Sequence, residues 1–501
     1  MSALEWRFEF PEVLDDKGTF LGFDIIIANP PYMRVQEIET TQPLQKDFYE
    51  RDFLTARGSY DLANLFFELA VHLARKGVNN NIFIFPHKLF NSANGASLRE
   101  YLMNTHAIKQ ITHFGANQVF DSAITYTCIA LFNTEATKTF RFKRFALGDA
   151  FKLELDSQNA YIDLKYDDIA AASKLYGNNQ WIFFDDPKGF GVFEKIFANS
   201  SPLSDNVSVF VGLQTSRDTL YVAKKLSETA NSYRILVNPD GRTDEPLVPT
   251  REFIVEKTFF RPFLMGKDVH RYETLKTDRL VFFPYYVKAQ ADLVRIDDLK
   301  QSYPKTFDFV MSNKIAFESR EKGKAKKLKE WYAYIYEKNL TKFDQDKLTS
   351  MEICTSHPNI ALNRAKIYHS TTVYGLVAAN SAAPRYEFLL GVLNSRLFWW
   401  FLKSTGDTLQ GDARRMKTNY LNPFPLPELI SHENEEHLSD LVIDLIAKKA
   451  SAEPSHSIAE RESEINQAVY KLYGLNEEDI HVVETETNPI FAPNELILDI
   501  D

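Results

Sequence analysis

An apolar run that stops abruptly on a rigid polar tetrapeptide constrains the fold of this chain more than any other feature. Residues 23–28 read Phe-Asp-Ile-Ile-Ile-Ala, and Asn-Pro-Pro-Tyr follows directly at 29–32. A near-continuous β-branched run is typical of a strand buried on both faces of a parallel sheet. Proline fixes φ, lacks an N–H and makes the residue before it extended. We therefore predict a buried strand that ends in a rigid loop.

The same tetrapeptide has the chemistry to bind an exocyclic amine. The Asn29 side-chain oxygen can accept one hydrogen from an adenine N6 amine, and the rigid carbonyl beside Pro30 can accept the other. Two acceptors bias the nitrogen toward a pyramidal, nucleophilic geometry, and a base flipped out of DNA can stack on Tyr32. An ordinary turn at a strand end is the alternative. The full match favours function, so the candidate catalytic residues are Asn29, Pro30, Pro31 and Tyr32.

Strand and helix patterns alternate after this loop. A polar stretch runs to Arg57, long enough to form an active-site loop. Apolar residues then repeat at helical spacing over 62–73, with Gly77 in the position of a capping glycine. A further helix is predicted at 95–105, and strands at 82–85, 108–114 and 125–132. This alternation predicts a doubly wound α/β sheet.

From about Lys138 the alternation of strand and helix patterns gives way to short alternating strands. We expect an α/β domain over 1–137, a connecting β-rich segment over 138–194 and a mixed α+β recognition domain over 195–427. Two amphipathic helices are predicted at 431–450 and 457–473, within an acidic tail that covers 428–501. A chain of 501 residues is long enough for two or three hydrophobic cores.

The net charge of -10 is concentrated in the tail. Residues 428–501 contain 18 acidic and 4 basic residues, a balance of -14, which leaves +4 on residues 1–427. A mildly basic body permits a groove that follows phosphates. The two cysteines, Cys128 and Cys354, suit buried thiols of a reducing cytoplasm. We find no membrane-spanning run or signal peptide, and no metal site is expected.

Two basic groups are candidates for contact with DNA. Lysines crowd one polar segment and include Lys322, Lys324, Lys326 and Lys327. Such a run is usually a solvated face, but on this body it is a candidate for phosphate contacts. Arg414 and Arg415 can read guanine edges bidentately, although arginines in loops more often contact phosphates.

Together these motifs resemble the adenine-N6 DNA methyltransferases of bacterial restriction-modification systems. The resemblance is strongest to fused restriction-methylation enzymes with a TaqI-like C-terminal specificity domain, and it extends from Phe8 onward. Residues 29–32 match the catalytic motif, and 85–88 (Phe-Pro-His-Lys) resemble the segment after the fifth strand. Phe114-Gly115 with Phe120 resembles the loop of the target pocket, and 411–415 the end of the specificity domain.

The resemblance implies a double-stranded DNA substrate and S-adenosylmethionine as the methyl donor. It places Phe114 and Phe120 where an aromatic ring stacks on the target adenine, although core packing suits Phe120 equally well. It places Asp61 near the methionine part of the donor. At a helix N-terminus, however, Asp61 is first of all a candidate N-cap.

One departure from the family is large. The family binds the donor with a glycine-rich loop upstream of the catalytic motif, but here that motif arrives at residue 29, and only Gly189-Phe190-Gly191 offers a GxG. We therefore predict the C-terminal half of a Rossmann-like methyltransferase sheet (1–137), a mixed α+β DNA-specificity domain and a helical tail. The exposed edge of this half-sheet would be Ile25, Ile26 and Ile27.

This prediction implies a split or truncated methyltransferase. An N-terminal methyltransferase or nuclease half, or a partner subunit, would then complete the donor site. The alternatives are a non-catalytic DNA-specificity subunit and an inactive relic of such an enzyme.

Overall fold

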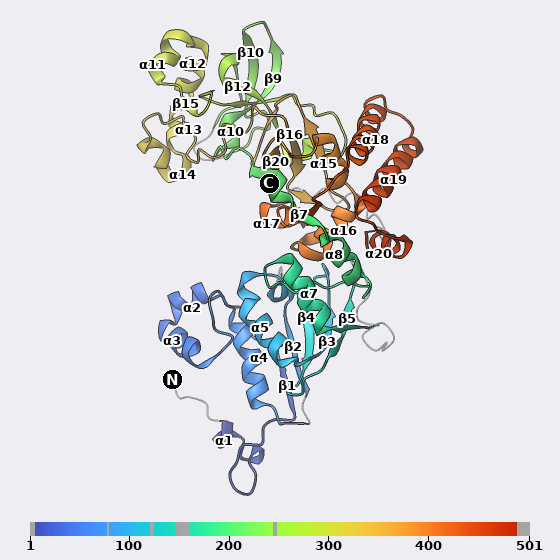
Figure 1. The fold of residues 1–501 in the computed structure, drawn as a ribbon. Coiled ribbons are helices and arrows are strands. Elements are labelled where there is room, and N and C mark those ends of the chain that lie inside the picture. The colour runs from blue at the N-terminus through green and yellow to red at the C-terminus, as the bar shows by residue number, and fades with distance from the viewer. Residues whose placement is uncertain are drawn as a thin grey trace. The chain divides into compact units, whose positions relative to one another are not determined.

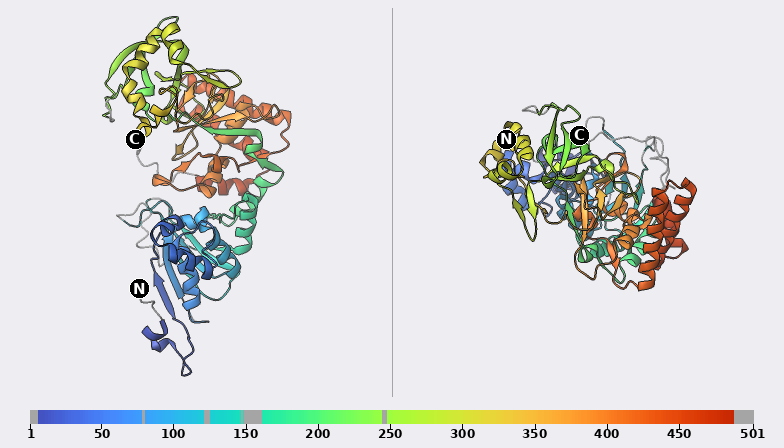
Figure 2. Two further views of the ribbon diagram at one scale, coloured as in Figure 1. Left: turned by 90° about the vertical axis from the view of Figure 1, so that its left-hand side faces the viewer. Right: turned by 90° about the horizontal axis from the view of Figure 1, so that it is seen from above.

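The computed structural model describes residues 6–77, 80–120, 125–146, 148, 161–243 and 248–487. The chain forms two compact units (Figures 1 and 2). Unit 1 consists of Met1–Asn199, Trp400–Arg414 and Gly474–Asp501, and unit 2 consists of Ser200–Trp399 and Arg415–Tyr473. Unit 1 therefore takes elements from three separate parts of the sequence.

A six-stranded sheet organises unit 1, in the order β1-β2-β4-β3-β5-β6. The strands are β1 (Ile25–Ala28), β2 (Asn80–Pro86), β3 (Ile108–His113), β4 (Thr127–Phe132), β5 (Thr139–Arg144) and β6 (Ile162–Lys165). β1 is parallel to β2, β3 is parallel to β5, and β4 is antiparallel to both β2 and β3. The carboxyl ends of β1, β2, β3 and β5 therefore meet at one edge of the sheet, which is the α/β arrangement that the sequence predicts.

The predicted elements around this sheet are confirmed. α4 (Leu62–Leu73) and α5 (Ala96–Thr105) form at the predicted helices, and β2, β3 and β4 at the predicted strands. Asp61 is the N-cap of α4, and its carboxylate accepts a hydrogen bond from the Ala63 N–H at 3.1 Å. The helix ends at Leu73, so the expected capping role of Gly77 is wrong; Gly77, with φ of 81°, lies in the turn that follows.

β1 is not buried on both faces. The predicted burial of this strand is therefore wrong, whereas the predicted exposed edge is confirmed. β1 lies at the edge of the sheet, and the side chains of Ile25 and Ile27 are 62% and 74% exposed. Its apolar sequence is suited to a covered strand, but within the described part of the chain β2 is its only neighbour. The exposed apolar edge that the family resemblance implies is therefore present.

The polar stretch before Arg57 is not a structureless loop. It forms α2 (Val35–Thr41) and α3 (Pro43–Asp52). Val35 and Ile38 pack with Tyr60 and Leu65 in a small hydrophobic cluster. The helices form because these few apolar side chains supply a small core. The polar composition of the segment gives little indication of that core.

The expected connecting segment supplies part of the sheet. β5 pairs with β3, and β6 pairs with β5, so both strands extend the sheet of unit 1. α7 (Tyr166–Tyr176) and α8 (Gly189–Phe197) follow. A Cβ on Gly189 would lie 2.5 Å from the Phe184 ring, so close packing alone accounts for the first glycine of the GxG. The division into domains stays a prediction.

Two sheets and several short helices form unit 2. The larger sheet has the order β11-β10-β9-β13-β12-β19, and the smaller has the order β18-β16-β20-β8. Strands of the larger are β9 (Val222–Glu228), β10 (Ser232–Val237), β11 (Arg251–Glu256), β12 (Phe260–Leu264), β13 (Arg279–Phe282) and β19 (Tyr368–His369). Strands of the smaller are β8 (Val207–Val211), β16 (Lys347–Met351), β18 (Ile360–Asn363) and β20 (Val373–Ala378).

Short strand pairs and helices complete the described chain. The pairs are β7 (Ser200–Pro202) with β22 (Pro425–Pro427), β14 (Tyr285–Val287) with β15 (Ala291–Leu293), and β17 (Ile353–Cys354) with β21 (Arg414–Arg415). The shorter helices are α1 (Trp6–Glu9), α9 (Leu203–Asn206), α10 (Asp218–Tyr221), α11 (Ile296–Ser302), α12 (Pro304–Ser312), α13 (Lys314–Glu318), α14 (Arg320–Gly323), α15 (Tyr386–Leu393), α16 (Arg396–Thr405) and α17 (Thr418–Leu421).

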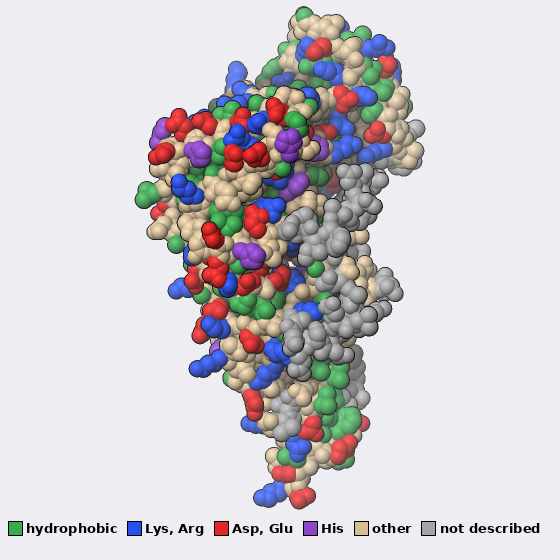
Figure 3. Space-filling view, turned by 90° about the vertical axis from the view of Figure 1, so that its right-hand side faces the viewer, with side chains coloured by type: hydrophobic (Ala, Val, Ile, Leu, Met, Phe, Trp, Pro, Cys, Tyr) green, Lys and Arg blue, Asp and Glu red, His purple; other side chains and the backbone are tan. Residues whose placement is uncertain are grey.

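The described part of the acidic C-terminal tail, residues 428–487, is largely helical, as predicted, and residues 488–501 lie outside the described residues. α18 (His432–Ala450) and α19 (Ser455–Leu472) occupy the expected positions, and α20 (Glu477–Thr487) is an additional helix. Acidic side chains are interspersed with basic ones on the face shown in Figure 3. Arg461 on α19 pairs with Asp444 on α18 at 2.8 Å. Part of the negative charge is therefore balanced within the helical pair.

Three further features of the described residues concern the cysteines, the helix lengths and the metal-ligating side chains. Both cysteines, Cys128 and Cys354, are buried free thiols, and burial raises the pKa of each. None of the helices that the structure describes has the length and apolarity to cross a bilayer. The described residues also contain no cluster of His, Cys, Asp and Glu side chains suited to a metal ion.

We predict that the exposed edge of β1 makes the isolated chain self-associate, because an unpaired apolar edge strand can pair with another chain. Ile27→Lys should shift the chain toward monomer in sedimentation-velocity runs across a concentration series. Leu429→Lys is the matched control, since Leu429 is 93% exposed and belongs to unit 2, outside the sheet that contains β1. A wild-type chain that stays monomeric, or equal effects of the two variants, would contradict this.

Candidate functional site

The tetrapeptide at 29–32 lies directly after β1, at the carboxyl edge of the sheet. Asn29 is exposed, Pro30 is buried and Tyr32 is half-buried. The Tyr32 hydroxyl donates a hydrogen bond to Asn29 Oδ1 at 2.8 Å and lies 3.3 Å from the Ile84 carbonyl oxygen on β2. The motif is thereby attached to the neighbouring strand.

The hydroxyl of Tyr32 orients the Asn29 amide. Burial, with smaller effects of Cys128 and Asp61, raises the pKa of Tyr32 to about 12, so the hydroxyl keeps its proton at neutral pH. An amide oxygen has two lone pairs. Oδ1 of Asn29 therefore accepts from Tyr32 and keeps a second lone pair for another donor on the exposed side. This geometry suits binding of an amine.

Asp61 lies close to the motif and caps α4. The residues after the motif and those before α4 are joined by the Arg34–Asp61 bridge and by the bond from the Leu62 N–H to the Met33 carbonyl at 2.8 Å. Asp61 is buried, and burial raises the pKa of its carboxyl. The capping role is observed directly, whereas contact with a methyl donor stays a prediction.

The structure separates the two aromatic candidates for base stacking. Phe114 is 2% exposed and stacks on Phe145, with ring centroids 5.8 Å apart. Its placement is that of a core residue, because one ring face is covered and the side chain has almost no open surface. Phe120 is half-buried and retains accessible surface. The stacking prediction is therefore carried by Phe120.

Two histidines that the sequence reasoning did not single out lie at the same sheet edge. His87 follows β2 and His113 ends β3, and their rings stack with centroids 4.5 Å apart. Burial lowers the pKa of His87 to about 3 and that of His113 well below its usual value. Both imidazoles are therefore neutral at physiological pH. The signals in the sequence were the place of His87 in the family-like segment 85–88 and the place of His113 near the end of the predicted strand 108–114.

Arg414 is not placed to read a base, which corrects that expectation. Its side chain is 4% exposed and donates to Asp412 Oδ1 at 2.9 Å and to the Asp412 carbonyl at 2.8 Å. Burial opposes ionisation of Asp412, yet Arg414 and Lys403 hold the pKa of its carboxyl below the usual value. Arg415 is more exposed and lies 3.9 Å from Glu352. Contact of Arg415 with DNA stays a prediction.

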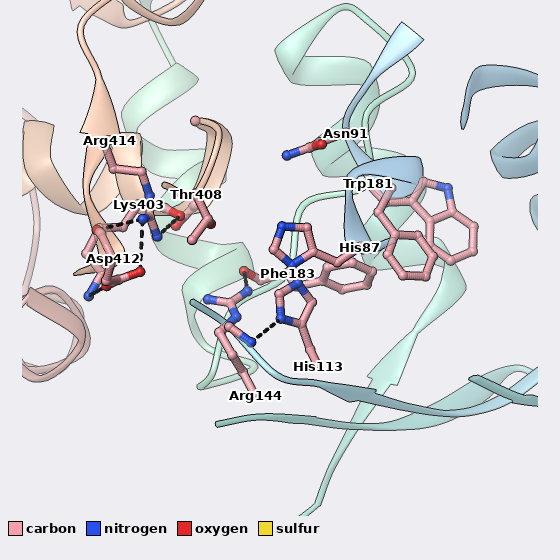
Figure 4. Close-up of a pocket in the computed structure, with 14 residues that line it drawn as sticks. His87, Asn91, His113, Arg144, Trp181, Phe183, Lys403, Thr408, Asp412 and Arg414 are labelled. Carbon is pink, nitrogen blue, oxygen red and sulfur yellow. Dashed lines mark hydrogen bonds and ion pairs between the residues drawn. The ribbon is translucent and has the colours of Figure 1, made fainter. Parts of the chain in front are cut away.

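These arginine and histidine side chains line one pocket of unit 1. Figure 4 shows His87, His113 and Arg144 on one side and Lys403, Asp412 and Arg414 on the other. Arg144, at the end of β5, donates to the Phe183 carbonyl at 3.0 Å. The remaining lining residues are Phe90, Asn91, Gly115, Trp181, Phe183, Ser404, Gly406 and Thr408.

The candidate lysines of unit 2 are free to contact a ligand. They occupy α14 and the 3-10 helix η7 (Lys324–Lys327). Ala325 is buried within this segment and anchors it. The four candidates are exposed and form no salt bridge with any residue that the structure describes: Lys322, Lys324, Lys326 and Lys327.

The parallel strands of unit 1 and the motif at 29–32 agree with the resemblance to DNA methyltransferases, and unit 2 is a second, α+β unit. Comparison with known families specifies this resemblance further. Residues 1–120 match the family described as Eco57I restriction-modification methylase, and residues 261–426 match the TaqI-like C-terminal specificity domain. The chain is thus homologous to the Type II restriction-modification methyltransferases, as the motifs at 29–32 and 411–415 predict.

Two curated relatives extend this similarity over most of the chain. The Type II restriction enzyme and methyltransferase RM.Eco57I of Escherichia coli is 25% identical over 423 residues, which are 81% of this chain and 40% of that protein. The Type II methyltransferase M.BstVI of Geobacillus stearothermophilus is 20% identical over 494 residues, which are 94% of this chain and 76% of that protein.

A solved structure shows the same fold. MmeI, a Type IIL restriction-modification enzyme determined in complex with DNA, has a TM-score of 0.55 and 13% sequence identity. The likeness covers 96% of this chain and 57% of that one. This chain therefore spans well under two thirds of the length of both MmeI and RM.Eco57I.

We predict that the neutral His87 makes the fold sensitive to acid. Its pKa is about 3 in the folded chain and about 6.5 in the unfolded chain. As the pH falls below 6.5, only the unfolded state binds the proton, so stability is lost. From pH 6.5 to 5 the loss for one such histidine is about 2 kcal/mol in the free energy of unfolding.

The test compares urea unfolding at pH 7 and pH 5. His87→Phe should weaken the pH dependence of the free energy of unfolding by this amount, since the ring stacking is kept and the titrating group is removed. The control is His432→Gln, because the His432 side chain is 89% exposed. Equal pH dependence in the wild type and His87→Phe would show that this imidazole titrates normally.

Proposed function

We propose that this chain carries the adenine pocket and the DNA-specificity domain of a Type II restriction-modification enzyme that methylates adenine at N6. The observation that carries the proposal is the exposed Asn29 Oδ1, oriented by the Tyr32 hydroxyl at 2.8 Å. It lies within the region that matches the Eco57I methylase family. The homology to Type II methyltransferases supports double-stranded DNA as the substrate.

The residues of the motif position the amine. The free lone pair of Asn29 Oδ1 accepts one N6 hydrogen, and the carbonyl beside Pro30 accepts the other. The N6 lone pair is then directed at the methyl group, and the positive charge that develops on N6 is stabilised by the two acceptors. The rate enhancement comes from placement and from preorganised acceptors. S-Adenosylmethionine, bound as the donor, supplies the sulfonium methyl group.

The donor site is proposed to need a second polypeptide or segment. Near the motif, Asp61 is a group suited to the methionine end of the donor, and its carboxylate already caps α4. A glycine-rich donor loop is not found in the described part of the chain that surrounds β1. The exposed edge of β1 offers a place for a further strand to pair. We propose that a methyltransferase half carrying the remaining strands binds there.

A non-catalytic DNA-specificity subunit is the second candidate. The match of residues 261–426 to the TaqI-like specificity domain favours it, as do the exposed lysines of α14 and η7. Site-specific DNA binding is common to both proposals, and methyl transfer distinguishes them.

Asn29→Ala should abolish methyl transfer in the reconstituted enzyme. Loss of one preorganised acceptor of this kind typically costs about 3–4 kcal/mol in the transition state, which is about 10²–10³-fold in kcat. Tyr32→Phe keeps the ring and removes only the orienting hydroxyl, so a smaller loss is expected, about 1 kcal/mol. Transfer of labelled methyl groups to DNA measures both.

Binding of DNA serves as the control for folding of the Asn29→Ala variant. Specific binding should stay near the wild-type level, because Asn29 lies outside the lysine segment. Wild-type turnover by the Asn29→Ala variant would contradict the assignment of Asn29 to the adenine pocket. Site-specific binding by a wild-type enzyme that never transfers methyl groups, with donor and partner present, would favour the specificity subunit.

The lysine segment should set the salt dependence of DNA binding. Each phosphate contact contributes about -0.9 to the slope of log K against log salt concentration. The triple variant Lys324→Ala, Lys326→Ala, Lys327→Ala should therefore flatten the slope by up to about 3, with unchanged sequence preference. Fluorescence anisotropy with labelled duplex over a salt series measures the slope.

A matched triple variant uses three other exposed lysines of unit 2, which are Lys267, Lys276 and Lys300. It removes the same charge and should leave the slope near that of the wild type. Equal slopes in the two triple variants would show that the lysine segment is only a solvated face and does not contact phosphates.

A further inference from the structure

The pocket between the strand ends and residues 403–414 of unit 1 has no role in the proposed methyl transfer. One wall is formed where β2, β3 and β5 end, and the other by the segment from Lys403 to Arg414 (Figure 4). Both walls belong to the same compact unit. The composition of the pocket is polar and rich in cationic groups.

The strand-end wall presents neutral imidazoles beside a cation. The Gly115 N–H donates to His113 Nδ1 at 2.9 Å, so the proton of this neutral ring is on Nε2. His87 is 4% exposed, and its Nδ1 has no hydrogen-bond partner among the described residues. Asn91 Oδ1 is buried and likewise lacks a partner in the described structure. Arg144 adds a positive charge to this wall.

The opposite wall contains a buried donor that needs an acceptor. The terminal nitrogens of Arg414 are bonded to Asp412 and to backbone carbonyls, but Nε has no partner within the described chain. A guanidinium does not lose its proton in proteins, so this N–H can only donate. Lys403 lies 3.3 Å from Asp412 and adds another cation.

The charges on the pocket walls favour an anion. Arg144, Lys403 and Arg414 face one carboxylate, that of Asp412. Asp185, outside the lining, approaches Arg144 at 3.5 Å and offsets part of that charge. A buried donor left unpaired costs about 1–3 kcal/mol, which an acceptor oxygen recovers. An anion with several oxygens meets both conditions.

We propose that this pocket binds a phosphate group, supplied by a phosphodiester of the DNA strand whose adenine is methylated. The proposal rests on the proposed function and adds to it a contact that fixes the DNA backbone beside the flipped base. The sheet order supports this source. β2 is one step and β3 three steps from β1, and at about 4.8 Å per step these distances are about 5 and 15 Å.

A phosphate held at that edge would position the strand on which Asn29 acts. Contacts to phosphates fix register without reading sequence. They also stabilise a backbone from which a nucleotide has been turned out, where stacking energy has been lost.

Two single substitutions test the pocket in the full chain. Lys403→Gln and Arg144→Gln should each flatten the salt slope of DNA binding by about 1, with unchanged sequence preference. Lys174→Gln is the matched control, because Lys174 is exposed on α7 outside the pocket and its loss removes the same charge. A slope equal to the control in both folded variants overturns the proposal.

Inorganic phosphate provides the second measurement. At constant ionic strength, phosphate in place of chloride should raise the Tm of the wild type and of Lys174→Gln, and this rise should be reduced in both pocket variants. A phosphate effect without any change in DNA salt slope would identify a site for free phosphate and overturn the assignment to DNA. Failure of the wild type to bind DNA at all would refute the proposed function instead.

Discussion

The parallel pairing of β1 with β2 positions the motif at 29–32 of the proposed adenine pocket. Ile25 to Ala28 lie opposite Asn80 to Phe83, so β1 ends beside the middle of β2. Because the motif begins at the next residue, Tyr32 reaches the Ile84 carbonyl on β2. That contact places the Tyr32 hydroxyl on Asn29 Oδ1. Displacement of this single pair of strands would separate the acceptor from the group that orients it.

The same pairing explains why one edge of the sheet gathers so many polar groups. β1, β2, β3 and β5 share one direction, so their following residues converge, as ligand sites do at the carboxyl ends of strands in open α/β sheets. Asn29, His87, His113 and Arg144 all lie at or just beyond such ends. The proposed methyl-transfer site and the proposed phosphate pocket are consequences of one topology.

The sequence predicted the features that depend on contiguous residues. Residues 29–32 carry their chemistry within four positions, and Asp61 caps α4 because capping is local. The exposed β1 edge could be inferred from the family order of strands. The apolar run alone could not show how far β1 is buried. Such a run indicates that a strand can be covered, but not whether a neighbour is present to cover it.

The features that were missed depend on distant contacts. His87 and Arg414 are 327 positions apart, so no local pattern joins them in one pocket. The charge of Arg414 suggested that it reads a base edge, but its burial is decided by Asp412 and by carbonyls of the folded segment. Phe114 is an aromatic residue of the kind that stacks on a base. Its packing on Phe145 arises only because β5 joins the sheet, which no local pattern shows.

The proposed role of Asn29 and its neighbours is to present an adenine for methylation. Single-molecule sequencing of the DNA of cells that express the chain with its methyltransferase partner tests it most directly, because every modified base is identified in its sequence context. We expect N6-methyladenine at one short recurring sequence, and its loss when this chain is deleted. Modification of cytosine in place of adenine, or an unchanged pattern after deletion, would contradict it.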